Sequence, residues 1–126
     1  MRYLIDTHVA LWVLKGEPIS DEANAVINDL GVEIFVSIVS AWEVAIKVTL
    51  GKLKYDGGVK AFLDDIKLND FRMLGVEETY IEQLERLEYH HRDPFDRLLV
   101  ATAVAEGMTF ISADENIPKY NVAHLW

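Results

Sequence analysis

The sequence predicts an α/β protein with a small parallel sheet covered by helices on both faces. Short apolar segments rich in β-branched and aromatic residues alternate with longer segments of helical character. This alternation is typical of parallel sheets, because the crossovers place helices on the faces. A helical segment near the C-terminus carries no charge from Leu98 to Ala105, and such a helix is expected to be buried.

The first half of the chain contains two predicted strands and three predicted helices. An apolar strand over residues 3–5 leads into a helix over residues 7–14, which stops at a glycine and a proline. A helix over residues 20–30 has acids in its first turn, where the helix dipole favours them. The strand over residues 33–37 is followed by a helix over residues 39–50, which ends at a glycine.

The second half repeats the alternation after a glycine-containing loop. Apolar residues recur at helical spacing in the segment after this loop, and a short strand and a second amphipathic helix follow. The remaining predicted elements are a helix at 58–68, a strand at 71–74, helices at 77–89 and 94–106, a strand at 108–112, a helical turn at 114–119 and a strand at 121–125.

The apolar helix at 94–106 carries the clearest boundary signals. Asp93 is a good N-cap because its carboxylate can accept hydrogen bonds from free N–H groups of the first turn. Pro94 occupies the first helical position, where its missing N–H is tolerated, and Gly107 provides the end. Asp96 lies one turn into the helix, on the same side as Asp93.

Length and composition indicate one soluble domain over residues 1–126. The chain has no cysteine, which excludes disulfides and thiolate metal sites. No signal-peptide core or run of roughly 18 to 20 apolar residues is present, so we expect a cytoplasmic protein without a membrane partner. A net charge of −9 argues against broad adhesion to nucleic acid, so any nucleic-acid function needs a cation or a local basic strip.

Four acids stand where a site could form. Asp6 and Asp114 follow predicted strands, at the sheet edge where parallel α/β proteins place their sites. Glu43 and Asp96 lie in apolar helical segments, and a buried carboxylate needs a compensating group.

Each acid also has a local explanation, and these alternatives stay open at this stage. Asp6 and Asp114 could cap the helical segments that follow them. Asp96 could complete a capping box with Asp93, and Glu43 could pair with Lys47 one turn later. One shared site would explain all four together.

Converging carboxylates repel one another unless cations neutralise them. Hard divalent ions such as Mg²⁺ or Mn²⁺ take oxygen ligands, activate water and stabilise charge on a phosphoryl group. The four histidines, His8, His90, His91 and His124, do not have the spacing of zinc ligands. Residues 90–92 are interpreted as a polar loop ahead of the helix.

Several segments, in order along nearly the whole chain, resemble a PIN-domain ribonuclease, specifically a VapC-like toxin of a type II toxin–antitoxin pair. The resemblance is carried by Leu4-Ile5-Asp6-Thr7-His8, by Ser40-Ala41-Trp42-Glu43-Val44-Ala45-Ile46-Lys47 with Leu50-Gly51-Lys52-Leu53, by His91-Arg92-Asp93-Pro94-Phe95-Asp96-Arg97-Leu98-Leu99-Val100-Ala101-Thr102-Ala103, and by Ile111-Ser112-Ala113-Asp114-Glu115-Asn116.

The resemblance implies a three-layer α/β/α sandwich and an endoribonuclease that hydrolyses RNA with Mg²⁺ or Mn²⁺. The implied acidic quartet is Asp6, Glu43, Asp96 and Asp114. Thr7, Ser112 and Asp93 match positions that support the acids, with Asp93 the expected cap. The implied partners are RNA, an antitoxin protein and a second copy of the chain.

Exposed apolar residues are expected to serve the protein contacts; the candidates are Trp12, Leu14, Tyr55 and Phe62, each of which could equally belong to the core.

Other functional classes fit the sequence less well. A haloacid-dehalogenase-type phosphatase needs a second acid two residues after the first, where this chain has His8. A receiver-type phospho-acceptor needs an acid pair beside a central aspartate and a lysine after one of its last strands, and neither feature is evident. A non-catalytic PIN-fold module that binds RNA or protein remains the alternative, because an intact acidic quartet does not prove turnover.

Overall fold

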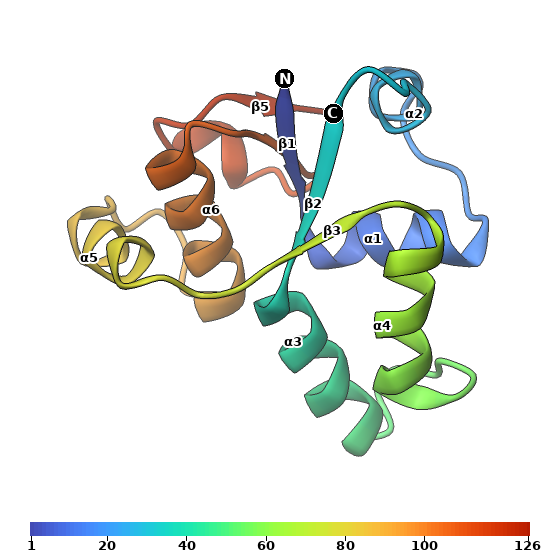
Figure 1. The fold of residues 1–126 in the computed structure, drawn as a ribbon. Helices are drawn as coiled ribbons and strands as arrows, with labels where there is room; N and C mark the ends of the chain where they lie inside the picture. The colour runs from blue at the N-terminus through green and yellow to red at the C-terminus, as the bar shows by residue number, and fades with distance from the viewer.

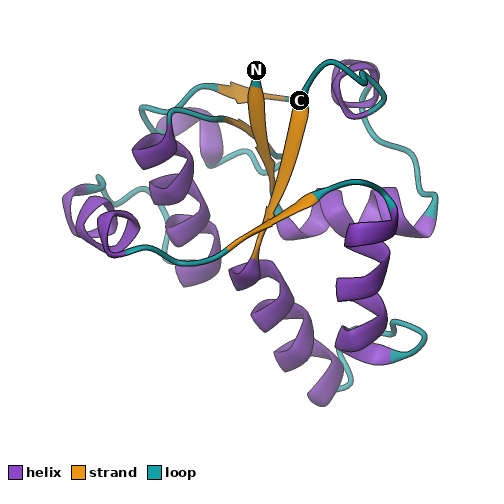
Figure 2. Ribbon diagram, in the orientation of Figure 1, coloured by secondary structure: helices purple, strands orange, loops and turns teal.

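The computed structural model describes residues 1–126 as a parallel sheet flanked by helices on both sides (Figure 1, Figure 2). This arrangement confirms the predicted α/β sandwich. In chain order the elements are β1 (Arg2–Ile5), α1 (Thr7–Lys15), α2 (Asp21–Ile27), β2 (Glu33–Ser37), α3 (Ile38–Thr49), α4 (Gly58–Leu68), β3 (Arg72–Leu74), α5 (Glu78–Arg86), α6 (Pro94–Glu106), β4 (Thr109–Ile111), the 3-10 helix η1 (Ile117–Lys119) and β5 (His124–Leu125).

The sheet is wound outward in both directions from its first strand. The strand order is β3-β2-β1-β4-β5, and every neighbouring pair is parallel. Leu4 in β1 lies in register with Phe35 of β2 on one side and Phe110 of β4 on the other. Successive strands are therefore added on one side of β1 up to β3 and on its other side from β4 onward, so the strand order reverses between β1 and β4. Parallel α/β sheets bind ligands beyond the carboxyl ends of the strands at such a point.

Alternating side chains of β1 enter two separate cores. Tyr3 and Ile5 point to the face covered by α1, α2, α3 and α4, where they pack with Val9, Val44 and Phe62. Leu4 points to the opposite face, into a second core that is formed largely by α6. Both faces of β1 are apolar because both are buried, as expected for a central parallel strand.

Helix α6 has the ends that the sequence predicts. The Asp93 carboxylate accepts hydrogen bonds from the backbone N–H groups of Phe95, at 2.9 Å, and of Asp96, at 3.1 Å. Gly107 closes the helix in the left-handed conformation, with φ at 66°. Leu99 and Val100 are fully buried against the sheet, and α5 covers the outer side of the helix (Figure 1).

Some predicted boundaries are wrong. The helix predicted over residues 77–89 ends at Arg86, because Leu87 turns to extended backbone and packs into the core beside α6. Helix α2 ends at Ile27 rather than near residue 30, and the last strand contains only His124 and Leu125. The turn predicted at 114–119 is helical only over Ile117–Lys119.

Of the four residues predicted as candidates for protein contacts, one is buried and three are half-buried. Phe62 is completely buried, so its assignment as a candidate contact residue is wrong. Trp12, Leu14 and Tyr55 are half-buried against the first core. The exposed aromatic residue nearest to the acids in sequence is Trp42, with 59% of its surface exposed. None of the helices combines the length and apolarity that a membrane crossing requires.

Candidate active site

The four predicted acids come from elements that meet at the carboxyl edge of the central strands. Asp6 follows β1, Asp114 lies three residues beyond β4, and Glu43 lies in the second turn of α3. Asp96 lies in the first turn of α6. The first turns of α1, α3 and α6 approach one another at the lower end of β1 and β2 in Figure 1, and α3 contacts both other helices.

Asp6 is almost completely buried and uses both carboxylate oxygens. Its Oδ1 accepts a hydrogen bond of 2.7 Å from the backbone N–H of Val9, which caps α1. Its Oδ2 accepts a hydrogen bond of 2.5 Å from the hydroxyl of Ser112. Burial raises the pKa of Asp6, and these two hydrogen bonds partly oppose that effect. Asp6 can therefore cap α1 and also belong to the candidate site.

Ser112 connects Asp6 to Asp114. While its hydroxyl donates to Asp6, its oxygen accepts a hydrogen bond of 3.1 Å from the backbone N–H of Asp114. Asp114 Oδ1 in turn accepts a hydrogen bond of 2.8 Å from the backbone N–H of Asn116. This hydrogen bond closes a turn ahead of η1, although η1 itself begins at Ile117 and has no side-chain cap. The second carboxylate oxygen of Asp114 accepts no hydrogen bond from the protein.

Glu43 combines an ion pair with an unsatisfied oxygen. Its side chain is 3% exposed, and Oε2 lies 2.7 Å from the Lys47 ammonium. Oε1 is buried and has no hydrogen-bond partner. An unpartnered buried carboxylate oxygen is costly, so this atom requires a donor or a cation that the chain does not supply.

Asp96 is buried and surrounded by negative charge. Its pKa is raised to about 8, first by burial and then by repulsion from other carboxylates, namely Asp93, Asp6, Glu43 and Asp114. Its carboxylate makes no hydrogen bond to the protein, so the capping box with Asp93 is not formed and only Asp93 acts as the cap. These influences place the four predicted acids in one electrostatic neighbourhood.

His91 also lies at this site, although the sequence interpretation assigned it to a polar loop. Its Nε2 is buried without a hydrogen-bond partner and lies 3.5 Å from Asp96 Oδ2. One ligand atom each of His91, Asp96 and Asp114 lie within 4.8 Å of one another. The feature of the sequence that could have indicated His91 is its position two residues before Asp93, the cap of the helix that begins at the edge of the site.

The three residues predicted to support the acids make different contacts. Ser112 donates directly to Asp6, and Asp93 holds the first turn of α6. The Thr7 hydroxyl instead donates a hydrogen bond of 2.9 Å to Ser40, which joins α1 to α3. Thr7 therefore contacts no acid through its hydroxyl, and its support is limited to the position of the two helices.

These residues fit a divalent cation. Carboxylate oxygens are the donors that Mg²⁺ and Mn²⁺ prefer, and repulsion among them falls when a cation is present. Glu43 Oε1 and His91 Nε2 are buried polar atoms that have no partner within the protein. The structure brings ligand atoms of His91, Asp96 and Asp114 within 4.8 Å of one another, whereas Glu43 and Asp6 lie outside this group. A cation held by the group would give His91 Nε2 a partner.

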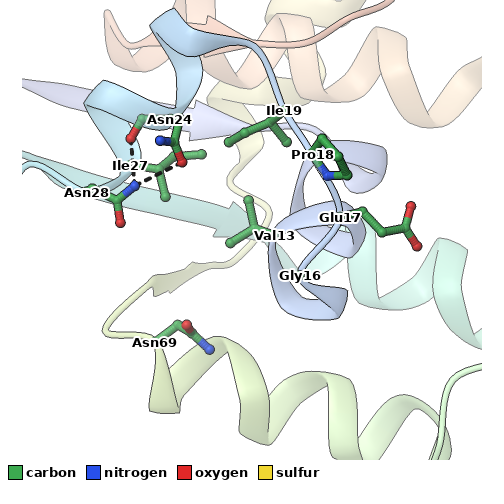
Figure 3. A pocket seen from close by; sticks show the side chains of 9 residues that line it. All are labelled: Val13, Gly16, Glu17, Pro18, Ile19, Asn24, Ile27, Asn28 and Asn69. Atoms are coloured by element: carbon green, nitrogen blue, oxygen red, sulfur yellow. Dashed lines mark hydrogen bonds between the residues drawn. The ribbon is translucent and has the colours of Figure 1, made fainter.

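Two hollows differ in their relation to the acids. One of about 500 Å³ lies beside Asp114 and is lined also by Ser112 and Trp126. Another of about 480 Å³ lies between the end of α1, α2 and Asn69 (Figure 3). The second is lined by none of the four acids, and the Glu17 carboxylate points away from its asparagines in Figure 3. Only the first is continuous with the candidate site.

Comparison with known proteins gives one family and a consistent fold. The PIN domain family matches residues 3–123. No curated protein sequence matches the chain. Among solved structures, VapBC2 from Rickettsia felis bound to a promoter DNA fragment superposes with a TM-score of 0.78 at 18% identity, covering 100% of this chain and 99% of that chain.

Two other complexes contain a chain of the same fold. VapBC-1 from nontypeable Haemophilus influenzae gives a TM-score of 0.71 at 16% identity, with coverage of 99% of this chain and 97% of that one. FitAcB from Neisseria gonorrhoeae gives 0.71 at 19% identity, with coverage of 98% and 96%. At these identities the likeness establishes the fold.

Proposed function

This chain belongs to the PIN domain family, and from that premise we propose that it is a metal-dependent endoribonuclease and the toxin of a toxin–antitoxin pair. The single observation that carries the proposal is the buried, unpartnered Glu43 Oε1. It lies near Asp96, whose pKa is raised to about 8 first by burial and then by the neighbouring carboxylates. Such an arrangement is costly without a cation and is relieved by one.

Asp6, Glu43, Asp96 and Asp114 are the proposed ligands and catalytic residues. Oxygen atoms remain available on Glu43, Asp96 and Asp114, whereas both oxygens of Asp6 accept hydrogen bonds within the protein. A bound Mg²⁺ or Mn²⁺ ion activates water and stabilises the negative charge that develops as a phosphodiester is hydrolysed.

The surrounding residues have positioning roles in this proposal. Ser112 fixes the orientation of Asp6, and Lys47 occupies Oε2 of Glu43, which leaves Oε1 for the ion. Asp93 holds the backbone of Asp96 at the start of α6. These contacts limit the motion of the acids, and a preorganised ligand set costs less reorganisation when a cation binds.

The substrate is proposed to be RNA. With a net charge of −9, the chain cannot attract a polyanion by its overall field, so attraction must be local. Lys52, Lys54 and Arg92 are exposed and available for phosphate contacts, whereas Lys47 and Arg97 are engaged by Glu43 and by Tyr120. The hollow beside Asp114 provides space next to the acids for part of the strand.

An antitoxin and a second copy of the chain are the proposed protein partners. The solved complexes of similar fold are described as VapBC and FitAcB assemblies, and one is described as a toxin–antitoxin complex from Klebsiella pneumoniae. For this chain, light scattering should give twice the 14.3 kDa chain mass. Relief of growth arrest by a co-encoded small protein tests the antitoxin.

The second candidate function is a PIN-fold module that binds RNA or protein without cleaving it. RNA cleavage with added Mn²⁺, with EDTA, and by the Asp96→Asn variant separates the two. Cleavage that requires the metal and is lost in the variant supports the nuclease. RNA binding without cleavage in any metal supports the module instead.

A further inference from the structure

We propose that His91 contributes a nitrogen ligand, through Nε2, to the divalent ion held by the acids, and that this ligand makes the site favour Mn²⁺ over Mg²⁺. The inference rests on the proposed function, since it concerns the same ion. It adds a residue outside the acidic quartet and gives the site a preference among metals.

The geometry around Nε2 favours a ligand over a hydrogen-bond donor. Nε2 lies 3.5 Å from Asp96 Oδ2, which is longer than an ordinary N–H···O hydrogen bond, and the atom has no other partner. Atoms bound to one ion at about 2.1 Å lie roughly 3 to 4.2 Å from one another. The separation from Asp96 falls within that range, and Asp114 offers a third ligand atom within the same 4.8 Å cluster.

The other ring nitrogen of His91 is held from the opposite side. Nδ1 lies 2.7 Å from the hydroxyl oxygen of Tyr120, which also accepts a hydrogen bond of 3.3 Å from the guanidinium of Arg97. We assign the proton to Nδ1, so that it donates to this oxygen and leaves the Nε2 lone pair facing Asp96. Metal-bound histidines commonly have their second nitrogen fixed in this way, which sets both tautomer and ring orientation.

The imidazole nitrogen of His91 is the ligand that makes the site favour Mn²⁺ over Mg²⁺. Mg²⁺ is a hard ion that binds oxygen and retains water, whereas first-row transition ions also accept imidazole. A site of carboxylates alone would discriminate weakly between Mg²⁺ and Mn²⁺. Addition of one imidazole strengthens binding of Mn²⁺ more than that of Mg²⁺.

His90 provides a matched control on the same loop. Its ring packs edge-on against Tyr120, with centroids 4.7 Å apart, as the ring of His91 does at 5.5 Å. Its Nε2, however, lies 3.0 Å from Glu88 Oε2, and Glu88 is exposed outside the site. Substitution of His90 therefore removes similar aromatic packing without removing the proposed ligand.

The test is pulsed EPR of Mn²⁺ bound to the full chain, in which a coordinated nitrogen modulates the electron-spin echo. We expect nitrogen modulation in the wild type and in His90→Asn, and its loss in His91→Asn. Heavy-isotope nitrogen labelling of histidine should change the modulation frequency in the unmutated protein, so the result does not depend on a variant that folds.

Calorimetric titration with Mn²⁺ and with Mg²⁺ provides the second readout. We expect Tyr120→Phe to weaken Mn²⁺ binding by about tenfold, the usual effect of removing a group that orients a ligand. His91→Asn should weaken Mn²⁺ binding further and Mg²⁺ binding less, so that the preference between the ions shrinks.

The outcomes separate this inference from the proposed function. If Mn²⁺ binds to the wild type without nitrogen modulation, or if His91→Asn keeps both the modulation and the Mn²⁺ preference, the role of His91 is refuted while the acidic metal site remains. If the wild type binds no divalent ion, the metal-nuclease proposal itself is overturned and the ligand role of His91 with it.

Discussion

The Ser112 hydroxyl donates a 2.5 Å hydrogen bond to Oδ2 of Asp6, across the two strands between which the sheet reverses its order. The backbone reinforces this contact, because the Asp6 N–H donates to the Ile111 carbonyl at 3.1 Å. A residue from the start of the chain and one near its end thus share one buried polar contact, which fixes the orientation of an acid in the candidate site.

Ser112→Ala should destabilise the protein by about 1 to 3 kcal/mol, because Asp6 Oδ2 is left buried without a donor. Loss of this hydrogen bond should also raise the pKa of Asp6 further, since the bond opposes the effect of burial. Urea denaturation measures the change in unfolding free energy. Thr49→Ala, which removes an exposed hydroxyl on α3, should lower the unfolding free energy much less. Equal losses of unfolding free energy in the two variants would show that the buried Ser112 contact stabilises the fold no more than an exposed hydroxyl does.

Asp93→Asn and Asp96→Asn should separate fold from activity. An asparagine at position 93 can still cap α6, so most RNA cleavage should remain. An asparagine at position 96 keeps the shape of the side chain but loses a proposed ligand charge, and cleavage should fall by at least about 100-fold. Initial cleavage rates at matched Mn²⁺ concentration give the comparison. Loss of activity in Asp93→Asn with retention in Asp96→Asn would reverse the two roles.

The metal-free protein should become less stable as the pH rises through neutrality. The pKa of Asp96 is about 8 in the folded chain, whereas the ordinary pKa of an aspartate is 3.8, and the pKa of Asp6 is also raised. Between these values the folded state binds more protons than the unfolded state, so the unfolding free energy falls with increasing pH. Denaturation in EDTA should therefore give a higher unfolding free energy at about pH 5.5 than at about pH 8.5.

The same pH series on Asp96→Asn tests the cause of the effect. The variant should be less sensitive to pH over this range, while Asp64→Asn, which changes an exposed partner of Lys60, should behave like the wild type. A profile of unchanged steepness in Asp96→Asn would exclude this carboxyl group as the source.

Divalent metal should stabilise the folded chain by mass action. A hundredfold excess of Mn²⁺ over its dissociation constant adds about 2.7 kcal/mol to the unfolding free energy if the unfolded chain does not bind it. Thermal melts with Mn²⁺ and then with added EDTA measure the gain and its reversal. The gain should shrink in Glu43→Gln, which removes a proposed ligand charge, and a full gain in that variant would exclude Glu43 from the site.

Tyr80→Phe should affect stability without affecting cleavage. The Tyr80 hydroxyl donates a 2.7 Å hydrogen bond to Glu106, whose carboxylate also pairs with Arg2 at 3.3 Å. This cluster ties α5 and α6 to β1 away from the acids, and loss of one such hydrogen bond costs about 1 kcal/mol. Denaturation and cleavage assays on the same preparation measure both effects, and a large loss of activity would show unexpected coupling to the site.

The sequence predicted the fold well because its signals are local and repeated. The cap at Asp93, the proline after it and the stop at Gly107 define α6 within its own residues, and the structure confirms all three. The end of α5 could not be predicted in this way. Leu87 leaves the helix to pack beside α6, and this tertiary contact overrides a helical pattern that continues to residue 89.

The site was only partly predictable for a related reason. Acids after strands and in apolar helices are conspicuous, because a buried charge in such a segment has few local explanations. His91 carried no comparable signal, since a histidine in a polar loop is ordinary and its orientation depends on Tyr120, 29 residues away. Phe62 illustrates the opposite error, because an aromatic residue on an amphipathic helix can face either a partner or the core, and here it faces the core.

The central position of β1 has a consequence for synthesis on the ribosome. β1 is made long before β4, yet its second edge is completed only when β4 pairs with it. Until then Asp6 lacks the Ser112 hydroxyl, and Asp114 has not been made. Since domains complete such long-range pairings late, the acids of the candidate site would come together only after β4 and the residues that follow it have been made.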